Sequence, residues 1–378
     1  MAIPRLAIPQ PALGQARHLQ PALKHLSQGE HERALGLLLD LRSRYPHDPL
    51  VAEVLGMAQY DAARYADACA SLGEASVLAG GASVYLYNEG SALLLAGRPD
   101  KALSAYVRSL RGDEIFIDAH RWTWSALAAS GKLSPVLKRF RTGLRDDTVD
   151  CRTGTEQQKV PLDDVTLCAI DCVDPTLAIR SLRRSTKGCS FGAARLLTSR
   201  SCRYKDVETV QIPQITSKEG YSRFVMKDLA RYVDTAFTLV TQWDGYVVNP
   251  GNWRPEFLQC DYIGATWDVD LIRSWGETPT HNVGNGGFSL RSKRLLAAGG
   301  DRRLAQIHPE DAQLCRRYRP LLEAEYGIRY ADAALADQFS FEANLQGTTP
   351  FGFHGAYNIA LFEPDPKWIR FEFAPDFL

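Results

Sequence analysis

An acidic residue stands where one apolar segment of the chain would leave a β-sheet. The stretch TLVTQWDGYVVNP, residues 238–250, begins with four residues that suit a buried strand and then reaches Asp244, with Gly245 directly behind it. A glycine at this place lets the chain turn and lets a ligand approach the backbone closely. Asp-Gly is also a common turn pair. Asp244 is therefore either a turn former or a binding residue, and this fragment alone does not separate the two roles.

A glycine cluster lies further along the chain, in VGNGGFSLRS, residues 283–292. Asn285, Gly286 and Gly287 precede a short predicted strand, and Ser292 is placed to cap a following helix. The run lacks the G-x-G-x-x-G spacing of a dinucleotide-binding loop. It is typical either of a tight turn or of a backbone that a bulky ligand approaches closely.

Two acids and a late histidine complete the residues that could do chemistry. Glu310 and Asp311 fall in the first turn of a helix predicted in HPEDAQLCRRYRPLL, residues 308–322. Acids at this position stabilise the helix dipole, whereas a catalytic carboxylate would act as a general base toward an attacking hydroxyl. His354, in PFGFHGAYNI, is either a core histidine or a metal ligand.

The elements that must position these residues alternate between strand and helix. Strands are predicted at 165–170, 191–199 and 207–213, and a further strand ends at Asp244; helices are predicted at 177–186 and 220–233. Thr216 and Glu219 have the spacing of a capping box for the second helix. The order β-α-β-β-α-β predicts a mostly parallel sheet covered by helices. Because ligands of such sheets bind beyond the carboxyl ends of the strands, Asp244 is well placed for binding.

The first third of the chain repeats with a period of 34 residues. Three rows of residues share this spacing. The first row has small residues (Gly29, Ala63, Gly97 and Gly131), and the second has small apolar residues (Ala34, Ala68, Ala102 and Val136). The third row has bulky residues (Leu38, Leu72, Tyr106 and Phe140). The pattern resembles the tetratricopeptide repeat over residues 13–145, in four units. Such repeats form a curved helical solenoid whose concave face binds a peptide or another protein. The alternative is a scaffold that only braces the second domain.

Composition limits the kind of protein and its partners. A chain of 378 residues with 45% hydrophobic residues and 44 charges of each sign predicts two folded domains with no long-range attraction to nucleic acid. No window approaches the roughly 18 apolar residues of a membrane span. The eight cysteines are scattered, as is typical of free thiols in a reducing cytoplasm, so a cytoplasmic protein is expected. The predicted divisions are a tail at 1–12, repeats at 13–145, a linker at 146–164 and an α/β domain at 165–378.

Several motifs of the second domain together resemble one enzyme class. QWDGYVVNPGNWRPEFLQCDYIGATW, VGNGGFSLRS, PED, ADQFSFE and FGFHGAYN occur in this order. They resemble the nucleotide-sugar glycosyltransferases of the GT-A fold, and more closely a little-characterised bacterial and fungal family of such domains. The resemblance covers residues 165–362.

The resemblance implies roles for the residues singled out above. In GT-A enzymes an Asp-x-Asp motif holds a divalent cation on the donor diphosphate; here that place reads Gln242-Trp243-Asp244, so only the second acid is kept. His354 matches a late histidine that often completes the metal site. The expected cation is Mn²⁺ or Mg²⁺, which would offset charge growing on the leaving nucleoside diphosphate. The missing first acid puts the requirement for metal in doubt.

The remaining sites also follow from the resemblance. Asp311, with Glu310 as the other candidate, matches the catalytic base of inverting enzymes. The substrate-binding residues would be Asn285, Gly286 and Gly287 on the sugar and acceptor side, Asp171 near the nucleotide base, Tyr221 and Lys227 in the donor site, and Trp267 either stacked on a sugar ring or in the core.

The sequence thus predicts transfer of a sugar from a nucleotide-sugar donor to a hydroxyl acceptor, with inversion. A UDP-sugar is the favoured donor, although the residues name neither nucleotide nor sugar. The solenoid would recruit a protein or peptide acceptor or partner. The alternative is a catalytically decayed nucleotide-sugar-binding protein or repeat scaffold. A glycoside hydrolase is disfavoured, because the adjacent Glu310 and Asp311 cannot flank one glycosidic bond.

Overall fold

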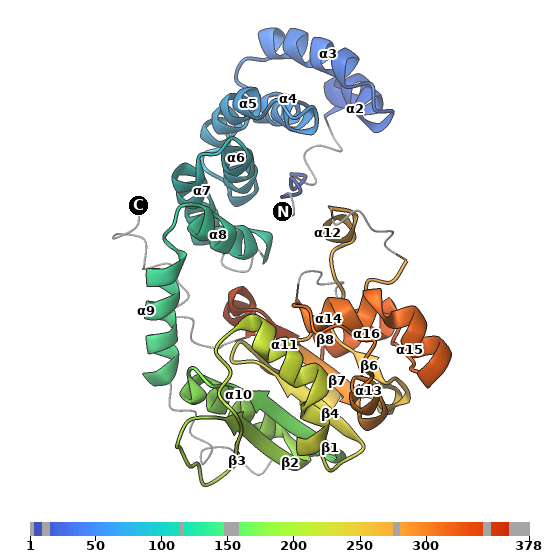
Figure 1. Cartoon of the computed structure of the whole chain (residues 1–378). Coiled ribbons are helices and arrows are strands. Elements are labelled where there is room, and N and C mark those ends of the chain that lie inside the picture. Colours follow the sequence, from blue (N-terminus) through green and yellow to red (C-terminus); the bar gives the residue numbers. More distant parts are fainter. Residues whose placement is uncertain are drawn as a thin grey trace. The chain divides into compact units, whose positions relative to one another are not determined.

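The structure, a computed structural model, describes residues 4–9, 16–113, 117–146, 159–274, 280–342 and 349–362 (Figure 1). These residues divide into two compact units, a helical unit of residues 4–140 and an α/β unit of residues 141–362. The division falls within helix α9 (Leu133–Asp146). Among the described residues, no helix is both long and apolar enough to cross a membrane.

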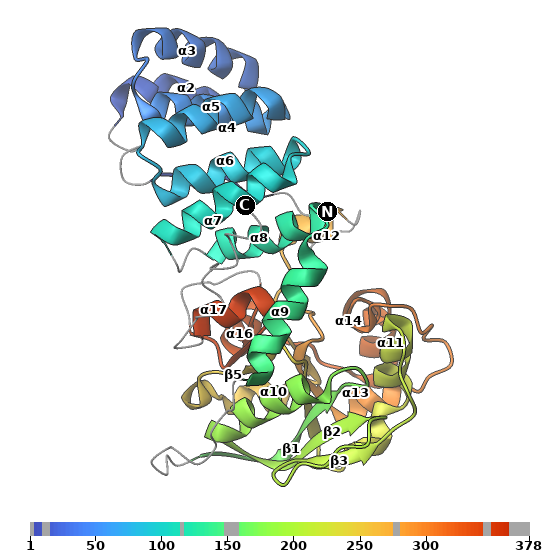
Figure 2. The same ribbon diagram turned by 90° about the vertical axis from the view of Figure 1, so that its left-hand side faces the viewer.

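The helical unit is built from antiparallel hairpins (Figure 2). Its described α-helices are α2 (Gln20–Ser27), α3 (His31–Arg44), α4 (Pro49–Asp61), α5 (Tyr65–Leu78), α6 (Ser83–Leu95), α7 (Pro99–Gly112), α8 (Ile117–Ala129) and the first part of α9. The turns within the hairpins fall on the first row of the 34-residue period. Gly29, Gly97 and Gly131 have φ of 74°, 71° and 73°, and Ala63 has φ of 57°. The row therefore marks positions where the chain adopts the left-handed conformation that glycine tolerates best.

The other rows of the period form the core of the helical unit. Ala34, Ala68 and Ala102 are fully buried, as is the bulky row at Leu72 and Tyr106. A Cβ on Gly56 of α4 would lie 2.5 Å from Cγ of Leu72 in α5, and one on Gly90 of α6 would lie 2.8 Å from Cε1 of Tyr106 in α7. The absence of a side chain at these glycines thus lets the two helices of a hairpin approach closely. The periodic pattern correctly predicted a repeat of this kind.

The α/β unit contains a mostly parallel sheet, which confirms the predicted fold class. Its strand order is β3-β2-β1-β4-β7-β6, with β1 to β4 parallel and β7 antiparallel to both of its neighbours, β4 and β6. The strands are β1 (Val160–Ile170), β2 (Cys189–Thr198), β3 (Glu208–Gln211), β4 (Phe237–Thr241), β6 (Tyr262–Ile263) and β7 (Phe288–Ser292). Strand β1 begins at Val160, inside the segment predicted as a linker. The linker residues 147–158 lie outside the described residues.

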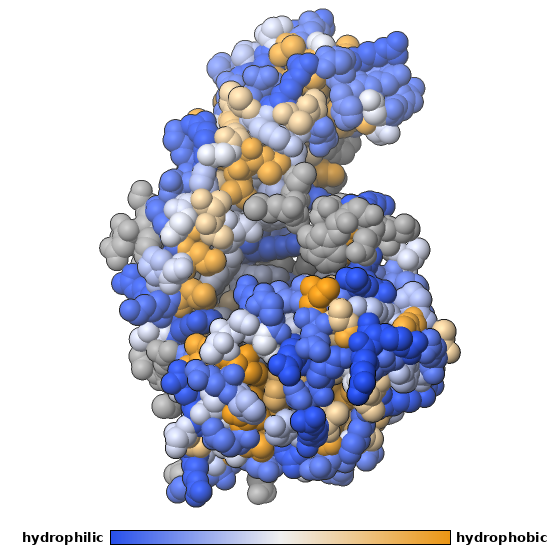
Figure 3. Space-filling view, in the orientation of Figure 1, coloured by the Kyte–Doolittle hydropathy of each residue, from blue (hydrophilic) through white to orange (hydrophobic). Residues whose placement is uncertain are grey.

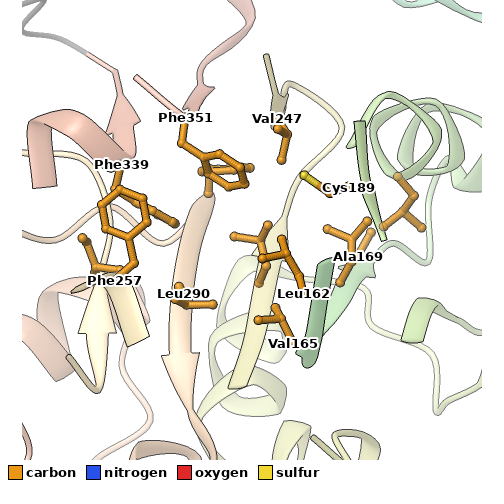
Figure 4. Close-up of a cluster of buried hydrophobic side chains, with 14 of the residues drawn as sticks. Leu162, Val165, Ala169, Cys189, Val247, Phe257, Leu290, Phe339 and Phe351 are labelled. Atoms are coloured by element: carbon orange, nitrogen blue, oxygen red, sulfur yellow. The ribbon is translucent and has the colours of Figure 1, made fainter. Parts of the chain in front are cut away.

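Helices cover both faces of this sheet. Leu167 and Ala169 of β1 pack on helix α10 (Pro175–Gly188), while Cys168 and Ile170 face helix α11 (Lys218–Lys227). Figure 4 shows the first of these clusters, which continues through Leu290 of β7 to a group of phenylalanines. The face of the α/β unit visible in Figure 3 is largely hydrophilic, as expected when the apolar residues of the strands are buried.

A second, three-stranded sheet of order β5-β9-β8 carries the late histidine. The remaining elements of the unit are β5 (Gly245–Val247), β8 (Ser340–Phe341), β9 (Gly352–His354), α12 (Val269–Ser274), α13 (Lys293–Ala298), α14 (Glu310–Ala312), a π-helical turn (Gln313–Arg317), α15 (Arg319–Tyr326), α16 (Ala333–Phe339) and α17 (Ile359–Phe362).

Two predicted helix caps have different outcomes. The hydroxyl of Ser292 accepts a hydrogen bond from the backbone N–H of Leu295, so Ser292 caps α13 as predicted. Helix α11 is capped by Ser217, whose hydroxyl accepts from the N–H of Gly220, and not by Thr216. The capping-box prediction was wrong by one residue, because Ser217 is itself a good capping residue one position closer to the helix.

Candidate active site

A cavity of about 640 Å³ opens at the carboxyl ends of strands β1 and β4. It collects residues that follow β1 and β4 and residues that precede β7, because β7 runs antiparallel and starts at the same edge. Most of the sequence-predicted site residues line it: Asp171, Tyr221, Asn285, Gly286, Gly287, Glu310, Asp311 and His354. Segments more than a hundred residues apart in sequence thus meet at one edge of the sheet.

Three predicted site residues do not line the cavity. Trp267 is buried in an apolar cluster, against the backbone of Gly284. Lys227, near the last turn of α11, donates from Nζ to the backbone carbonyl of Asp301 at 2.7 Å. Asp244 follows Gln242 and Trp243 in the sequence, and these two residues line the cavity. The structure therefore gives Trp267 a core position, one of its two predicted roles, and does not bring Lys227 to the cavity.

Asp244 and His354 form an ion pair at the edge of the cavity, which His354 lines. Oδ1 of Asp244 lies 3.5 Å from Nε2 of His354, and Oε1 of Gln242 lies 3.3 Å from the same nitrogen. On the other side of the ring, Nδ1 of His354 lies 3.0 Å from a carboxylate oxygen of Glu342. Although burial disfavours the charged ring, Asp244 and Glu342 raise the pKa of His354 well above its usual value. The imidazole is thus held between carboxylates on both of its nitrogens.

Glycines make this approach of distant segments sterically feasible. Gly245 pairs with His354 across β5 and β9, and a Cβ on Gly245 would lie 2.7 Å from the carbonyl oxygen of Phe353. A Cβ on Gly287 would overlap the imidazole ring of His354. The glycine directly behind Asp244 therefore lets the second sheet bring its histidine beside the acid.

The atoms around His354 have the chemistry of a divalent-cation site. Oδ1 of Asp244 is buried and accepts no hydrogen bond from the described residues. With Oε1 of Gln242 and with Nε2 of His354 in the neutral ring, it makes a set of oxygen and nitrogen donors that suits Mn²⁺; a cation would therefore replace the proton that the carboxylates favour on His354. Glu342 stands where a carboxylate commonly orients a metal-binding histidine. Within the described part of the chain, no group of three His, Cys, Asp or Glu side chains is arranged to hold a metal by itself. A cation here would need Gln242 and oxygen atoms of a ligand.

The two adjacent acids have different surroundings. Glu310 is buried; Oε1 lies 3.1 Å from Nη2 of Arg291, which is also fully buried, and Oε2 accepts from the hydroxyl of Ser222 at 3.3 Å. Oδ2 of Asp311 accepts from the backbone N–H of Gly286 at 2.8 Å. Burial, reinforced by the negative charge of Glu310, raises the pKa of Asp311 to about 6. Glu310 is thus engaged in an ion pair, while Asp311 has the raised pKa that suits proton transfer near neutral pH.

Asn285 connects the glycine cluster to the histidine. Its φ is 51°, a left-handed value that asparagine tolerates better than most residues. Its side-chain amide donates to Glu342 and its Oδ1 accepts from the N–H of Gly287 at 3.2 Å. The carboxylate of Glu342 thereby holds both Asn285 and His354.

One wall of the cavity has features that suit an anion. Thr216, Ser217 and Lys218, at the N-terminus of the ten-residue helix α11, line it together with His308. A helix N-terminus favours negative charge through its dipole and its free N–H groups. Sequence analysis considered Thr216 only as a helix cap and selected none of these residues for binding. The available signal was a strand end at Gln211 followed by Ser217 and Lys218 at the start of a helix.

Arg141 and Trp243 were also missed. Both line the cavity, and the guanidinium carbon of Arg141 lies 4.8 Å from the ring centroid of Trp243. Arg141 lies within residues predicted as repeats but belongs to the α/β unit, so no motif marked it.

Comparisons with known proteins give limited similarity. A family described as a protein of unknown function, DUF5672, matches residues 205–354, which include Asp244, Asp311 and His354 but not the repeats. No curated protein matches the chain.

Among solved structures, MamA MSR-1 C2 is 22% identical, covering 33% of this chain and 71% of its own, with a TM-score of 0.31. MamA from Desulfovibrio magneticus RS-1 is 15% identical over 33% of this chain and 71% of its own, with a TM-score of 0.31. A mutant O-GlcNAc transferase from Thermobaculum terrenum is 14% identical over 58% of this chain and 45% of its own, with a TM-score of 0.30. TM-scores this low do not establish a common fold.

Proposed function

We propose that the α/β unit is a glycosyltransferase that moves a sugar from a nucleotide-sugar donor to a hydroxyl group of an acceptor. The observation that carries the proposal is the convergence of Asp311, the Asn285–Gly287 backbone and the Asp244–His354 pair on one edge of a mostly parallel sheet. A cavity of about 640 Å³ is within the size range of small-molecule sites.

The donor would lie with its diphosphate between the N-terminus of α11 and the Gln242–Asp244 segment. The helix N-terminus and Lys218 supply positive potential to that side of the cavity. Asp171, directly after β1, would lie near the nucleotide base. Its Oδ1 accepts from the N–H groups of Val173 and Asp174, both at 2.7 Å, which shapes the turn that follows the strand.

Asp311 would act as the general base. The acceptor hydroxyl oxygen forms a bond to the anomeric carbon while the bond from that carbon to the donor phosphate oxygen breaks. Asp311 takes the hydroxyl proton, and the nucleoside diphosphate leaves with the electron pair of the broken bond. The N–H of Gly286 holds the carboxylate of Asp311 in place for this transfer. Attack from the side opposite the leaving group inverts the anomeric centre.

A divalent cation would be held by Asp244, His354 and Gln242, which fit it by their donor atoms and by the buried oxygen of Asp244. When bound, such a cation offsets negative charge on the leaving diphosphate. Glu342 would keep the ring of His354 oriented in either case.

The test is release of nucleoside diphosphate from UDP-, GDP-, CDP- and ADP-sugars, measured for the natural protein and for Asp311→Asn with Mn²⁺ present. We expect release from one donor class, and a rate lower by about 10²- to 10⁴-fold in Asp311→Asn, since that is the usual contribution of a general base. Asp67→Asn, at an exposed position of the helical unit, is the matched control and should keep the natural rate. Equal release by Asp311→Asn would refute the assigned base.

A binding protein without turnover is the second candidate, and one observation favours it. The place of the first acid of an Asp-x-Asp motif is taken by Gln242, whose amide carries no charge to attract a cation. Nucleotide-sugar binding with no release from any donor would establish this candidate instead.

A further inference from the structure

The helical unit holds a segment of its own chain that forms neither a helix nor a strand. Residues 4–9 lie against helices α4 and α6, whose side chains form hydrogen bonds with main-chain atoms of the segment. Tyr60 donates from its hydroxyl to the carbonyl of Pro4 at 2.6 Å, and Tyr87 donates to the carbonyl of Arg5 at 2.8 Å. Because every residue carries the same main-chain carbonyl, hydrogen bonds of this kind do not depend on one particular sequence.

Asn88 makes the most specific of these contacts. Its Oδ1 accepts from the N–H of Ala7 at 2.8 Å, and its Nδ2 donates to the carbonyl of the same residue at 2.7 Å. The pair of bonds matches one peptide residue as a neighbouring β-strand would. The amide of Asn88 also donates to Glu53. Because Glu53 and Asn88 are both fully buried, Glu53 fixes which way the amide faces.

The segment itself has the properties of a peptide ligand. Pro4 and Pro9 are buried while Arg5 and Ile8 are exposed, so the segment packs on the helical unit through its prolines. Proline fixes φ near the extended value and restricts the residue before it, which lowers the entropy lost when such a segment binds. Neither proline has an N–H to satisfy.

We propose that Tyr60, Tyr87, Asn88 and Glu53 form a peptide-binding groove that recognises the main chain of its ligand, and that residues 4–9 occupy it as a built-in competitor. The partner is an extended, proline-containing peptide segment, which must displace residues 4–9 to bind. Because the segment belongs to the same chain as the groove, its binding is intramolecular, so a segment that binds weakly in isolation still occupies the groove most of the time. This inference does not depend on the transfer chemistry of the other unit.

The test uses the full chain and a fluorescent peptide with the sequence of residues 3–10. Ala7→Pro removes the N–H that donates to Asn88 and leaves the groove unchanged. We expect the peptide to bind Ala7→Pro at least about tenfold more tightly than the natural protein, because the competitor is weakened. Equal affinity for both proteins, or binding to neither, would overturn the proposal.

A second peptide keeps the result independent of any change in protein folding. Methylation of the main-chain nitrogen that corresponds to Ala7 removes the same donor from the ligand. This peptide should bind Ala7→Pro at least about tenfold more weakly than its parent, and binding equal to that of the parent would refute recognition through Asn88. A natural protein that is dimeric and becomes monomeric in Ala7→Pro would assign the segment to a second copy of the chain, which also contradicts the proposal. Nucleotide binding by Ala7→Pro should match the natural protein, so the two proposals fail separately.

Discussion

The two units of this chain use glycine for opposite reasons. In the helical unit, Gly29 and Gly97 have positive φ and a Cβ built on either would meet nothing within 4 Å. In the α/β unit, Gly286 and Gly287 have ordinary backbone angles, but a Cβ would meet Glu310 at one position and His354 at the other. The first kind permits a turn and the second permits a close approach. Only the second kind is tied to the chemistry of a site.

The same contrast holds for how each unit assembles its functional groups. The groove is built from two neighbouring hairpins, since Glu53 and Asn88 lie on α4 and α6. The cavity draws on segments from Arg141 to His354. In the functions proposed here, local repetition builds a surface for a peptide, and long-range topology builds a pocket for a small molecule. Substitutions in only one of the two units test this contrast.

The largest stability effect is expected at the adjacent acids. Glu310→Gln leaves the buried charge of Arg291 without its partner, which should lower the free energy of unfolding by about 3–5 kcal/mol. Asp311→Asn removes a carboxylate whose raised pKa makes its charge unfavourable in the fold above about pH 6. At about pH 8 it should be as stable as the natural protein or more so.

Urea denaturation of both variants measures this difference. The sign of the difference follows from the pH dependence of folding. A carboxyl group whose pKa is higher in the folded than in the unfolded chain stabilises the fold at a pH below the pKa of the unfolded chain. This stabilisation is lost as the pH rises through the pKa of the folded chain. Equal destabilisation by the two substitutions would show that the buried charge of Arg291 depends on Asp311 as much as on Glu310.

The two kinds of glycine should respond differently to alanine. In Gly287→Ala the added methyl group displaces the imidazole of His354. This overpacking should lower the free energy of unfolding by about 1–3 kcal/mol and abolish nucleotide binding. Gly97→Ala should cost about 1 kcal/mol, from the left-handed backbone alone, and leave nucleotide binding intact. Calorimetry and a nucleotide titration on both variants check the pair. Intact binding in Gly287→Ala would remove His354 from the site.

Stability of the helical unit should depend on pH through Glu53. Burial raises its pKa to about 8, although its hydrogen bond with Asn88 opposes the shift. The folded chain therefore keeps a proton that the unfolded chain loses, and this contribution disappears as pH rises from about 4.5 to about 8. Relative to Glu53→Gln, the natural protein should lose roughly 4 kcal/mol between about pH 5 and pH 9.

Unfolding followed by far-UV circular dichroism at both pH values provides the comparison. Glutamine keeps the size of the protonated acid and an oxygen to accept from Asn88, so it is the matched variant. A constant difference between the two proteins across this range would contradict the shift.

The smallest effect is expected at Ala63, the alanine in the glycine row. Its φ of 57° strains an alanine by about 1–2 kcal/mol, while glycine would add unfolded-state entropy of about 0.4–1 kcal/mol. Ala63→Gly should therefore stabilise the helical unit by less than about 1 kcal/mol, seen as a small rise in Tm. A clear fall in Tm would mean that the methyl group of Ala63 packs favourably.

The sequence was most informative where interactions are local. The period of 34 predicted repeated helical hairpins, because each repeat packs on its neighbours, but it did not predict that Gly29 and Gly97 would lie in the turns. The mostly parallel sheet followed from the order of elements. The partners of Glu310 and His354 could not be predicted, because Arg291 and Glu342 reach them only through the pairing of β7 and the second sheet. For Trp267 the residue type left two roles open, sugar stacking or a core position, and only its burial in the fold distinguishes them.

A thermal-shift titration with UDP, GDP, CDP and ADP, with and without Mn²⁺, tests most directly whether the cavity is a donor site. At about 100 times its Kd, one nucleotide should stabilise the protein by about 2.7 kcal/mol. We predict that this shift grows with Mn²⁺ in the natural protein and that Asp244→Asn loses the metal-dependent part. No shift with any of the four nucleotides, with or without Mn²⁺, would contradict a donor site in this cavity.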